Sequence, residues 1–298
     1  FEAKPSLATR QCSMAAIEKI SAFLPQLIGG SADLSGSNNT KTNNSKIINS
    51  KNFNGNYIHY GVREHGMAAV MNGLALYGGI IPYGGTFLIF SDYCRPSIRL
   101  SALMGLKVIY VFSHDSIGLG EDGPTHQPIE QLAGLRAIPN LNVFRPADIN
   151  ETFECWELAL KNENTPSAIA LSRQKVSYIN PNNSKENKCE KGAYVVNLTS
   201  HESNVTLIAS GTEVELALKV QEKLKENNIH SKVVSMPCME LFDKQPEDYR
   251  KDILEENSLI ITIEAGGVMS WQKYIKNKGA NLGIDKFGES APYKEVYK

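Results

Sequence analysis

The sequence lacks the features that would tie it to a membrane or to nucleic acid. No apolar run approaches the ~20 residues of a membrane-spanning helix. With 31 Lys and Arg against 32 Asp and Glu, the net charge is −1, which gives no broad positive surface for nucleic acid or acidic membranes. Neither partner is therefore expected, and any anionic ligand must be held by a few local cations.

Paired cysteines and a secretion signal are also missing. The five cysteines are odd in number and scattered, and no C-x-x-C occurs, which is typical of reduced, buried thiols rather than of disulfides or a zinc site. The chain opens on Phe1 without a charged and then apolar leader, so we see no signal peptide. We expect a cytoplasmic protein whose sequence here starts inside a longer polypeptide.

What the sequence does contain is an alternation of short apolar strands and amphipathic helices. The runs 107–113 and 167–172 are nearly all apolar, as in parallel strands that are buried on both faces. Helices are predicted before and between these strands, and this order favours a parallel sheet covered by helices. The predicted helices are 9–23, 62–77, 87–103, 127–136 and 148–161.

The same pattern restarts after 180–188, a polar stretch of linker composition. We therefore predict an α/β protein of two consecutive domains, 1–182 and 190–298, each a mostly parallel sheet flanked by helices. The Asn-, Ser- and Lys-rich segment 38–54 is predicted to be a mobile surface loop that can act as an active-site flap. The second domain is predicted to contain strands 204–210, 231–236 and 258–265 and a helix 212–227.

The stretch HDSIGLGEDGPTHQP, residues 114–128, combines two histidines and three acids with three glycines. It follows a predicted parallel strand, and ligands of open α/β sheets bind beyond the carboxyl ends of such strands. The spacing matches neither H-E-x-x-H nor an alternating carboxylate loop, so no metal site is expected here. Contacts to a ligand and simple turn or cap roles both stay open. Pro128 is predicted to lie in the first turn of the next helix.

Two further segments admit both a structural and a functional interpretation. Glu64 in YGVREHGM opens an apolar helix, where an acid usually stabilises the helix dipole. A carboxyl among apolar groups can instead serve as a proton donor. In GGTFLIFSDY, aromatic residues recur every three positions, which predicts one aromatic helical face for core packing or for a flat heteroaromatic ring. These aromatic residues are Phe87, Phe90 and Tyr93.

Three side chains are candidates for binding an anion. Arg10 follows SLAT, Arg173 follows the predicted strand 167–172, and Ser37 lies in GGSADLSGSN. Each lies just beyond a predicted strand or helix end, where charge-assisted hydrogen bonds to a phosphate are favourable. Surface arginines are common, so position alone does not distinguish a phosphate site from an ordinary surface.

Taken together, these segments resemble the transketolases, thiamine diphosphate enzymes that move two-carbon ketol units. HDSIGLGEDGPTHQP and YGVREHGM are the most specific matches, and GGSADLSGSN, ALSRQ and FGESAP occur in family order with them over essentially the whole chain. The resemblance implies a pyrimidine-binding domain at about 1–182 and a C-terminal domain at about 190–298. It also implies transfer of a ketol unit from a ketose phosphate, such as xylulose 5-phosphate, to an aldose phosphate.

The resemblance implies how this chain would hold the cofactor. Glu64 falls on the carboxyl that hydrogen-bonds N1′ of the aminopyrimidine and favours the imino form, which takes the C2 proton of the thiazolium. His126 would lie near the 4′-nitrogen of the same ring, so the implied catalytic residues are Glu64 and His126. The aromatic wall around that ring would consist of Phe87, Phe90 and Tyr93.

A second set of residues is implied for the sugar phosphate. Asp122 and His126 match residues that meet the sugar hydroxyls and the reacting centre. Asp33 matches a residue of the substrate channel. The clamp on the terminal phosphate would consist of His114, Arg10, Ser37 and Arg173.

One family motif is absent. G-D-G…N, which holds Mg²⁺ or Ca²⁺ on the diphosphate, belongs to a domain that precedes this region in the family. The resemblance therefore implies the C-terminal portion of a longer transketolase, or the second subunit of a split one. Family active sites form between the subunits of a homodimer. We expect the chain alone to bind thiamine diphosphate at most weakly and to turn over no sugar phosphate.

Several alternatives stay open. Deoxyxylulose-phosphate synthase and the beta subunits of 2-oxoacid dehydrogenases share the glutamate and the layout, but they use pyruvate or another 2-oxoacid. GGSADL, TFLIFSDY and the His114 loop favour transketolase over these. Dihydroxyacetone synthase, which uses formaldehyde as acceptor, is harder to separate. From another class, the chain could be a catalytically dead scaffold, although all the matched polar groups are present.

Overall fold

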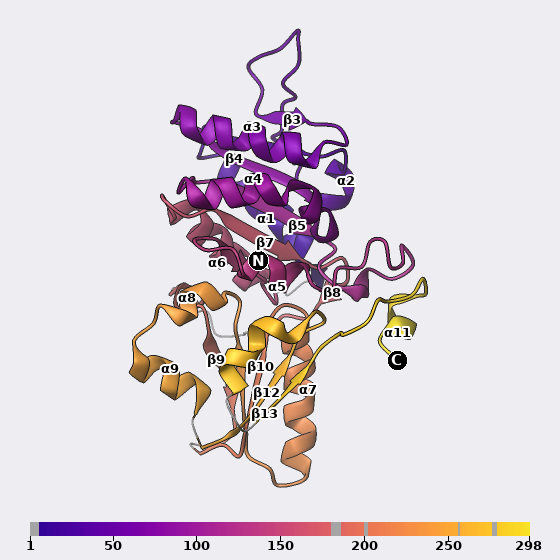
Figure 1. The fold of residues 1–298 in the computed structure, drawn as a ribbon, viewed down its shortest axis with the longest axis vertical. Coiled ribbons are helices and arrows are strands. Elements are labelled where there is room, and N and C mark those ends of the chain that lie inside the picture. Colours follow the sequence, from indigo (N-terminus) through magenta and orange to yellow (C-terminus); the bar gives the residue numbers. More distant parts are fainter. Residues whose placement is uncertain (1–5, 180–185, 200–201, 256, 276–278) are drawn as a thin grey trace.

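The computed structural model describes residues 6–179, 186–199, 202–255, 257–275 and 279–298. Two sheets follow one another along the chain and along the long axis of the molecule, the first above the second in Figure 1. The predicted α/β class with two consecutive, helix-flanked sheets is confirmed. No helix in the described part of the chain is long and apolar enough to cross a membrane.

The first sheet has six strands, all parallel, in the order β3-β2-β4-β5-β7-β6. Its central strands are covered on both faces, and all five residues of β5, IYVFS, are buried. A short antiparallel pair, β1 (Leu7–Ala8) with β8 (Lys175–Val176), joins the two ends of this region. The six strands are β2 (Leu27–Ser31), β3 (Tyr57–His59), β4 (Ile81–Phe87), β5 (Ile109–Ser113), β6 (Asn142–Phe144) and β7 (Ser167–Leu171).

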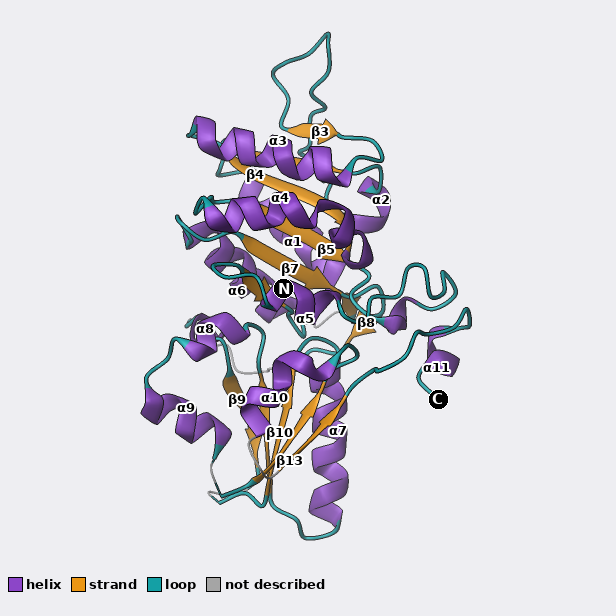
Figure 2. Ribbon diagram, viewed as in Figure 1, coloured by secondary structure: helices purple, strands orange, loops and turns teal. Residues whose placement is uncertain are grey.

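Helices cover both faces of the first sheet (Figure 2). On one face, α1 (Thr9–Ser21) and α6 (Ile149–Lys161) bury Ile17 and Trp156 against the strands. Asp148 ends the preceding loop by accepting a hydrogen bond from the Glu151 N–H at 3.0 Å, so it caps α6. The other face carries α3 (Glu64–Tyr77), α4 (Ser91–Leu103) and α5 (Gln131–Arg136).

The second sheet has five strands in the order β13-β12-β10-β11-β9, and β9 alone runs antiparallel to its neighbour. One face is covered by α7 (Glu213–Glu226) and the other by α8 (Met239–Asp243), α9 (Glu247–Leu254) and α10 (Gln272–Ile275). Residues 180–185 of the predicted linker 180–188 lie outside the described residues. The strands are β9 (Tyr194–Leu198), β10 (Val205–Ala209), β11 (Ser231–Ser235), β12 (Leu259–Ile263) and β13 (Gly279–Leu282).

The structure corrects the predicted helix 87–103 and its aromatic face. Phe87 is the last residue of β4, where it pairs with Ser113 of β5. Phe90 lies in a 3₁₀ turn and Tyr93 in α4, so the three rings do not share one helical face. The strand continues because its residues Pro82–Phe87 are all buried between helices, which favours extended backbone over the helical pattern.

The predicted helix start at Pro128 is wrong. The helix α5 begins at Gln131, three residues after Pro128. The side-chain oxygen of Gln131 accepts the Ile129 N–H at 2.9 Å, which holds a turn ahead of the helix. The short motif around Pro128 therefore belongs to the loop and not to the first helical turn.

The predicted surface loop 38–54 is corrected in part. Asn38 is fully buried, accepting a hydrogen bond from Ser31 at 2.9 Å and donating one to Ser113 at 2.8 Å. Thr40 is also buried and pairs with the Tyr57 hydroxyl at 2.8 Å. Thr42 is buried too, and Ile47 pairs with Tyr57 of β3, but most of the remaining residues of 41–54 are exposed. This part of the chain lies next to β3 at the end of the molecule (Figure 1). A flap role for it stays a prediction.

Candidate active site

The candidate site begins where parallel strands end at a common edge of the first sheet. Ser113 at the end of β5 lies opposite Phe87 of β4 and Leu171 of β7. The residues that follow these strand ends are thereby brought to one edge, which is the usual ligand position in open α/β sheets. Those that the sequence singled out are Asp33, His114 and Arg173.

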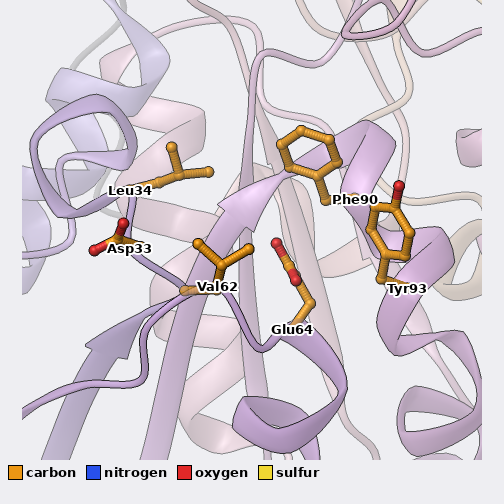
Figure 3. Close-up of a pocket in the computed structure, with 7 residues that line it drawn as sticks. Asp33, Leu34, Val62, Glu64, Phe90 and Tyr93 are labelled. Atoms are coloured by element: carbon orange, nitrogen blue, oxygen red, sulfur yellow. The ribbon is translucent and has the colours of Figure 1, made fainter.

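A pocket of about 380 Å³ opens beside Glu64 at this edge. Figure 3 shows the Glu64 carboxylate at the start of α3, pointing into the space between Val62 and the rings of Phe90 and Tyr93. Glu64 is only 9% exposed. Within the described residues, no group donates a hydrogen bond to it, so its carboxyl is available to a ligand. The full lining is Ala32, Asp33, Leu34, Val62, Glu64, Phe90 and Tyr93.

Aromatic and histidine rings form a continuous stack next to this pocket. The Phe87 ring lies parallel to Phe90 with centroids 5.7 Å apart, and it stacks on His114 at 3.7 Å. His126 meets Phe90 edge-on at 5.4 Å, and Tyr93 lies 5.9 Å from Phe90. The three predicted aromatics therefore do gather around one site, although a strand, a turn and a helix each supply one of them.

His114 is held rigidly at the end of β5. Its backbone has a φ of +62°, and its Nδ1 lies 2.8 Å from the Ser113 hydroxyl, which in turn receives a hydrogen bond from Asn38. Burial lowers the pKa of His114 to about 3, with further contributions from the charges of Arg10, Arg173 and His126. The imidazole is therefore neutral at pH 7 and acts as a hydrogen-bonding group.

Two arginines close to His114 have no acidic partner. Arg10 donates through Nη1 to the carbonyl of Ser37 at 2.8 Å, and burial together with the charge of Arg173 lowers its pKa. Across the described ranges, neither arginine forms an ion pair with a carboxylate. Uncompensated guanidinium groups near a buried imidazole are typical of an anion site, since each anion contact would relieve their mutual repulsion.

The two predicted acids of the substrate channel differ in position. Asp33 lines the Glu64 pocket and is exposed, with a φ of +61°. Asp122 is exposed on the loop four residues before His126, and the structure brings it into no hydrogen bond or ion pair with the other predicted site residues. The described part of the chain also contains no group of three or more His, Cys, Asp or Glu side chains that could hold a metal ion.

Family models match both halves of the chain. Residues 5–177 match the pyrimidine-binding domain of transketolase, and residues 192–298 match the transketolase-like C-terminal domain. The chain belongs to the transketolase family. It is 55% identical to the transketolase of Sinorhizobium medicae and 48% identical to that of Aquifex aeolicus, in each case over 98% of this chain and 42% of the relative. The chain thus spans less than half the length of these curated relatives.

Solved transketolases have the same fold. A Pichia stipitis transketolase in complex with sedoheptulose 7-phosphate is 40% identical, with a TM-score of 0.94 over 99% of this chain and 44% of that chain. A split-gene transketolase described as an inactive beta4 tetramer is 24% identical, with a TM-score of 0.77 over 98% of this chain and 93% of that chain. The second likeness is one of fold alone.

Sequence reasoning missed a buried charge cluster that begins at the residue after His114. Asp115 directly follows His114, is 2% exposed, and accepts a hydrogen bond from Arg145 Nε at 2.9 Å. Arg145 is fully buried and also binds Glu213 of the second domain. Asp115 lies in the stretch 114–128, but nothing local pointed to its pairing, because the residues that Arg145 binds lie 30 and 68 positions away in the sequence.

Proposed function

We propose that this chain takes part in the thiamine diphosphate-dependent transfer of a two-carbon ketol unit from a ketose phosphate, such as xylulose 5-phosphate, to an aldose phosphate. The proposal rests on one observation: stacked rings connect the Glu64 pocket to the cluster of His114, Arg10 and Arg173. Phe90 lines the Glu64 pocket and stacks on Phe87, which stacks on His114 beside the unpaired arginines. Pichia stipitis structures with sedoheptulose 7-phosphate and fructose 6-phosphate support a sugar phosphate as substrate.

The Glu64 pocket fits an aminopyrimidine. When bound, thiamine diphosphate would supply a nucleophilic carbon that makes it possible to cleave and form the carbon–carbon bond next to a ketone. Glu64 binds the ring nitrogen N1′ and holds a proton there, while the apolar lining excludes water. The rings of Phe87, Phe90 and Tyr93 hold the flat heterocycle. His126, edge-on to Phe90, is placed to exchange a proton near the reacting centre.

The arginine cluster fits the terminal phosphate of a sugar. Arg10 and Arg173 offer charge-assisted hydrogen bonds to its oxygens, and neutral His114 adds a donor without further repulsion. Ser37, on the short helix α2 (Ser35–Asn38), borders the same cluster through Arg10. The sugar hydroxyls between the phosphate and the pocket are assigned to Asp122 and His126, and the channel to Asp33.

The proposal also assigns the domains and the partner subunit. We assign the diphosphate and its Mg²⁺ or Ca²⁺ to a separate diphosphate-binding domain, and the residues 1–182 and 190–298 to the pyrimidine-binding and C-terminal domains. A homodimer with active sites between subunits is supported by apolar side chains left exposed on α3 and α4, among them Tyr77 at 85% and Leu103 at 70%. We propose that it acts in the cytoplasm, in the pentose phosphate pathway.

The test is a single substitution in the chain completed with a diphosphate-binding domain, fused or co-expressed. With thiamine diphosphate and magnesium, glyceraldehyde 3-phosphate released from xylulose 5-phosphate plus ribose 5-phosphate is followed. Wild type should release it, and Glu64→Gln should lose ~10² or more in kcat, the range of general acid–base groups. The matched control is Glu222→Gln, an exposed glutamate on α7, which should leave the rate unchanged.

Other outcomes distinguish the alternatives. No release from an intact, cofactor-bound wild type would rule out ketol transfer, and pyruvate would then be tried as donor. Absence of thermal stabilisation at saturating thiamine diphosphate would favour a scaffold. Turnover of sugar phosphates by the 298-residue chain alone would contradict our expectation that it is inactive without the diphosphate-binding domain.

A further inference from the structure

The last segment of the chain, residues 288–297, returns from the second sheet to the first. Figure 1 shows the yellow chain leaving β13 and running to the loops at the edge of the upper sheet, where α11 (Tyr293–Val296) lies. There α11 packs against a 3₁₀ turn, Ile117–Leu119, in the glycine-rich loop. The segment therefore contacts the loop that carries Asp122 and His126, although neither site described above includes it.

Hydrogen bonds join the segment to both halves of the loop. Gln127, 1% exposed, donates through Nε2 to the carbonyls of Gly120 and Glu289, each at 3.0 Å. The Ser290 hydroxyl donates to the carbonyl of Glu121. The attachment points Glu121 and Gln127 lie directly on either side of residues 122–126, so the segment fixes both ends of the substrate-facing stretch.

Shape agrees with the hydrogen bonds. A Cβ at Gly118 would lie 2.9 Å from the Tyr297 hydroxyl, and one at Gly288 would lie 2.0 Å from Oε1 of Gln127. Gly120 has a φ of +86° and faces the segment closely enough that a Cβ would meet the backbone nitrogen of residue 293 at 3.2 Å. Gly120 therefore lets two backbones approach closely, while Gly118 and Gly288 leave room for the side chains of Tyr297 and Gln127.

The conformation of this loop depends on turn hydrogen bonds within it and on contacts with neighbouring segments, of which 288–297 is one. Apart from one 3₁₀ turn, residues 114–130 contain no helix or strand, and glycine gives the free loop high conformational entropy. His126 nevertheless has a defined place, with its Nδ1 2.9 Å from the Thr125 hydroxyl and its ring against Phe90. A group that must meet a reacting atom within a fraction of an ångström needs this kind of support.

We propose that residues 288–297, which include Gly288–Pro292 of the otherwise unassigned FGESAP motif, form a positioning clamp for the loop 116–127. In this role Ser290 and Tyr297 are positioning residues that act through the loop on Asp122 and His126. The functional part of this inference rests on the proposed ketol transfer. The C-terminal domain thereby contributes to sugar binding and turnover. The Glu64 pocket is lined by no residue of the loop or clamp and meets the loop only where His126 contacts Phe90, so its Glu64 side should change little.

The first test measures the loop itself. In the 298-residue chain, Gly288→Ala places a methyl group against Gln127 and should raise amide hydrogen exchange in 116–127 about ten-fold, the scale of losing one local contact. Exchange in α3 should stay unchanged. The matched control is Gly73→Ala, since a Cβ at Gly73 would meet nothing within 4 Å. Unchanged protection of 116–127 in a folded Gly288→Ala chain would overturn the proposal.

A milder variant covers the case in which Gly288→Ala does not fold. Tyr297→Ala removes the hydroxyl that lies 3.4 Å from Ser116 and over Gly118 without adding bulk. It should again raise exchange in the loop. If the Tyr297→Ala chain folds and amide exchange in 116–127 stays as slow as in the wild type, the clamp does not stabilise the loop and the inference fails.

The second test separates positioning from general stability. In the completed enzyme, Tyr297→Ala should lower kcat/KM for sugar phosphates about ten-fold while the Kd for thiamine diphosphate stays at the wild-type value. Parallel losses of cofactor affinity and turnover would indicate a merely structural role. If wild type transfers no ketol unit, the proposed function fails, and the exchange measurement still decides whether the clamp exists.

Discussion

Two pairs of arginines in this molecule have opposite surroundings. The first pair, Arg136 and Arg145, lies buried between the two sheets and is surrounded by acids. Glu264 accepts hydrogen bonds from Arg136 through both of its oxygens, at 2.7 and 2.8 Å. Arg145 binds Asp115 at 2.9 Å and also Glu213. These acids come from both sheets, so the cluster joins the two halves of the molecule.

The second pair, Arg10 and Arg173, lies at the edge of the first sheet with no acid beside it in the described residues. Their charges lower the pKa of His114 to about 3 together with burial, the largest cause. The difference shows how position alone can mislead. Arg10, Arg145 and Arg173 all follow strand ends, but only the two without carboxylate partners retain their hydrogen-bonding capacity for a ligand.

The buried pair should give the largest effect when it is broken. Arg145→Met leaves Asp115 and Glu213 buried without their cation, which should cost about 3–5 kcal/mol in the free energy of unfolding. Urea unfolding of the chain, followed by circular dichroism, measures this loss. The matched control Arg173→Met should change stability by no more than about 0.5 kcal/mol, since Arg173 is exposed and unpaired. Equal stability of the two variants would remove the contrast.

The pair Arg10 and Arg173 should affect substrate binding rather than stability. In the completed enzyme, Arg173→Met should lose about 1.5–3 kcal/mol of phosphate binding, or on the order of 10- to 100-fold in kcat/KM for a phosphorylated acceptor. An unphosphorylated acceptor such as glycolaldehyde should be affected little, because it makes no phosphate contact. Arg99→Met, an exposed arginine of α4, is the control. Equal losses for both acceptors would show that Arg173 does not bind the phosphate.

The sequence predicted the positions of His114 and Arg173 at the sheet edge better than it predicted the buried cluster of Arg136 and Arg145. His114 and Arg173 follow apolar runs that are recognisable as buried parallel strands, and the ends of such strands meet at one edge by geometry. The positions of Phe87 and Phe90 were predicted as neighbours, but for the wrong reason. Their three-residue spacing suggested a helix, whereas the strand β4 and a 3₁₀ turn bring the rings together.

The charge cluster between the sheets could not be predicted in the same way. Arg145 and Glu213 are 68 residues apart, and Arg136 and Glu264 are 128 residues apart. Nothing local distinguishes these residues from solvated surface charges, because their burial depends on how the second sheet docks against the first. The clamp 288–297 was missed for the same reason: its partner loop lies more than 160 residues earlier in the chain.

His114 and Glu264 should contribute to the pH dependence of the free energy of unfolding in different pH ranges. The pKa of His114 is lowered from its ordinary 6.5 to about 3, so the unfolded chain takes up a proton that the folded chain refuses. Stability should therefore fall as the pH drops below about 6.5, with a slope of up to about 1.4 kcal/mol per pH unit. The pKa of Glu264 is lowered to about 2, chiefly by Arg136 against the opposing effect of burial. Its contribution is present above pH 4.5 and is lost as the pH falls towards 2.

The pH dependence is measured by urea unfolding between pH 7 and pH 5, above the range in which Glu264 takes up its proton. Burial raises the pKa of Glu151 to about 7, so this carboxyl contributes in the same window with the opposite sign. The contribution of His114 is therefore the difference between the curves of the wild type and of a His114 variant. His114→Asn should remove the fall in stability that the histidine causes as the pH drops, and the exposed His230→Asn should leave the wild-type curve unchanged. Inorganic phosphate should stabilise the wild type by occupying the space between Arg10 and Arg173. Wild-type and His114→Asn curves with the same slope from pH 7 to 5 would show that His114 is protonated as easily in the folded chain as in the unfolded one.

The smallest effect should come from a hydroxyl at the border of the arginine cluster. Ser37 holds Arg10 through its backbone carbonyl, at 2.8 Å, and this bond survives the loss of the side chain. Ser37→Ala should therefore remove a single hydrogen bond to the phosphate, worth about 0.5–1.5 kcal/mol or roughly 2- to 10-fold in kcat/KM for a phosphorylated acceptor. Ser35→Ala on the same short helix is the matched control, because its hydroxyl accepts a hydrogen bond from Tyr57 at 2.9 Å within the protein. We expect Ser35→Ala to lower the free energy of unfolding without changing kcat/KM for the phosphorylated acceptor. Ser37→Ala should lower kcat/KM without changing the free energy of unfolding. This result would extend the contrast between paired and unpaired polar groups to single hydroxyls. A Ser37→Ala enzyme with wild-type kcat/KM would place the phosphate on the arginines and His114 alone.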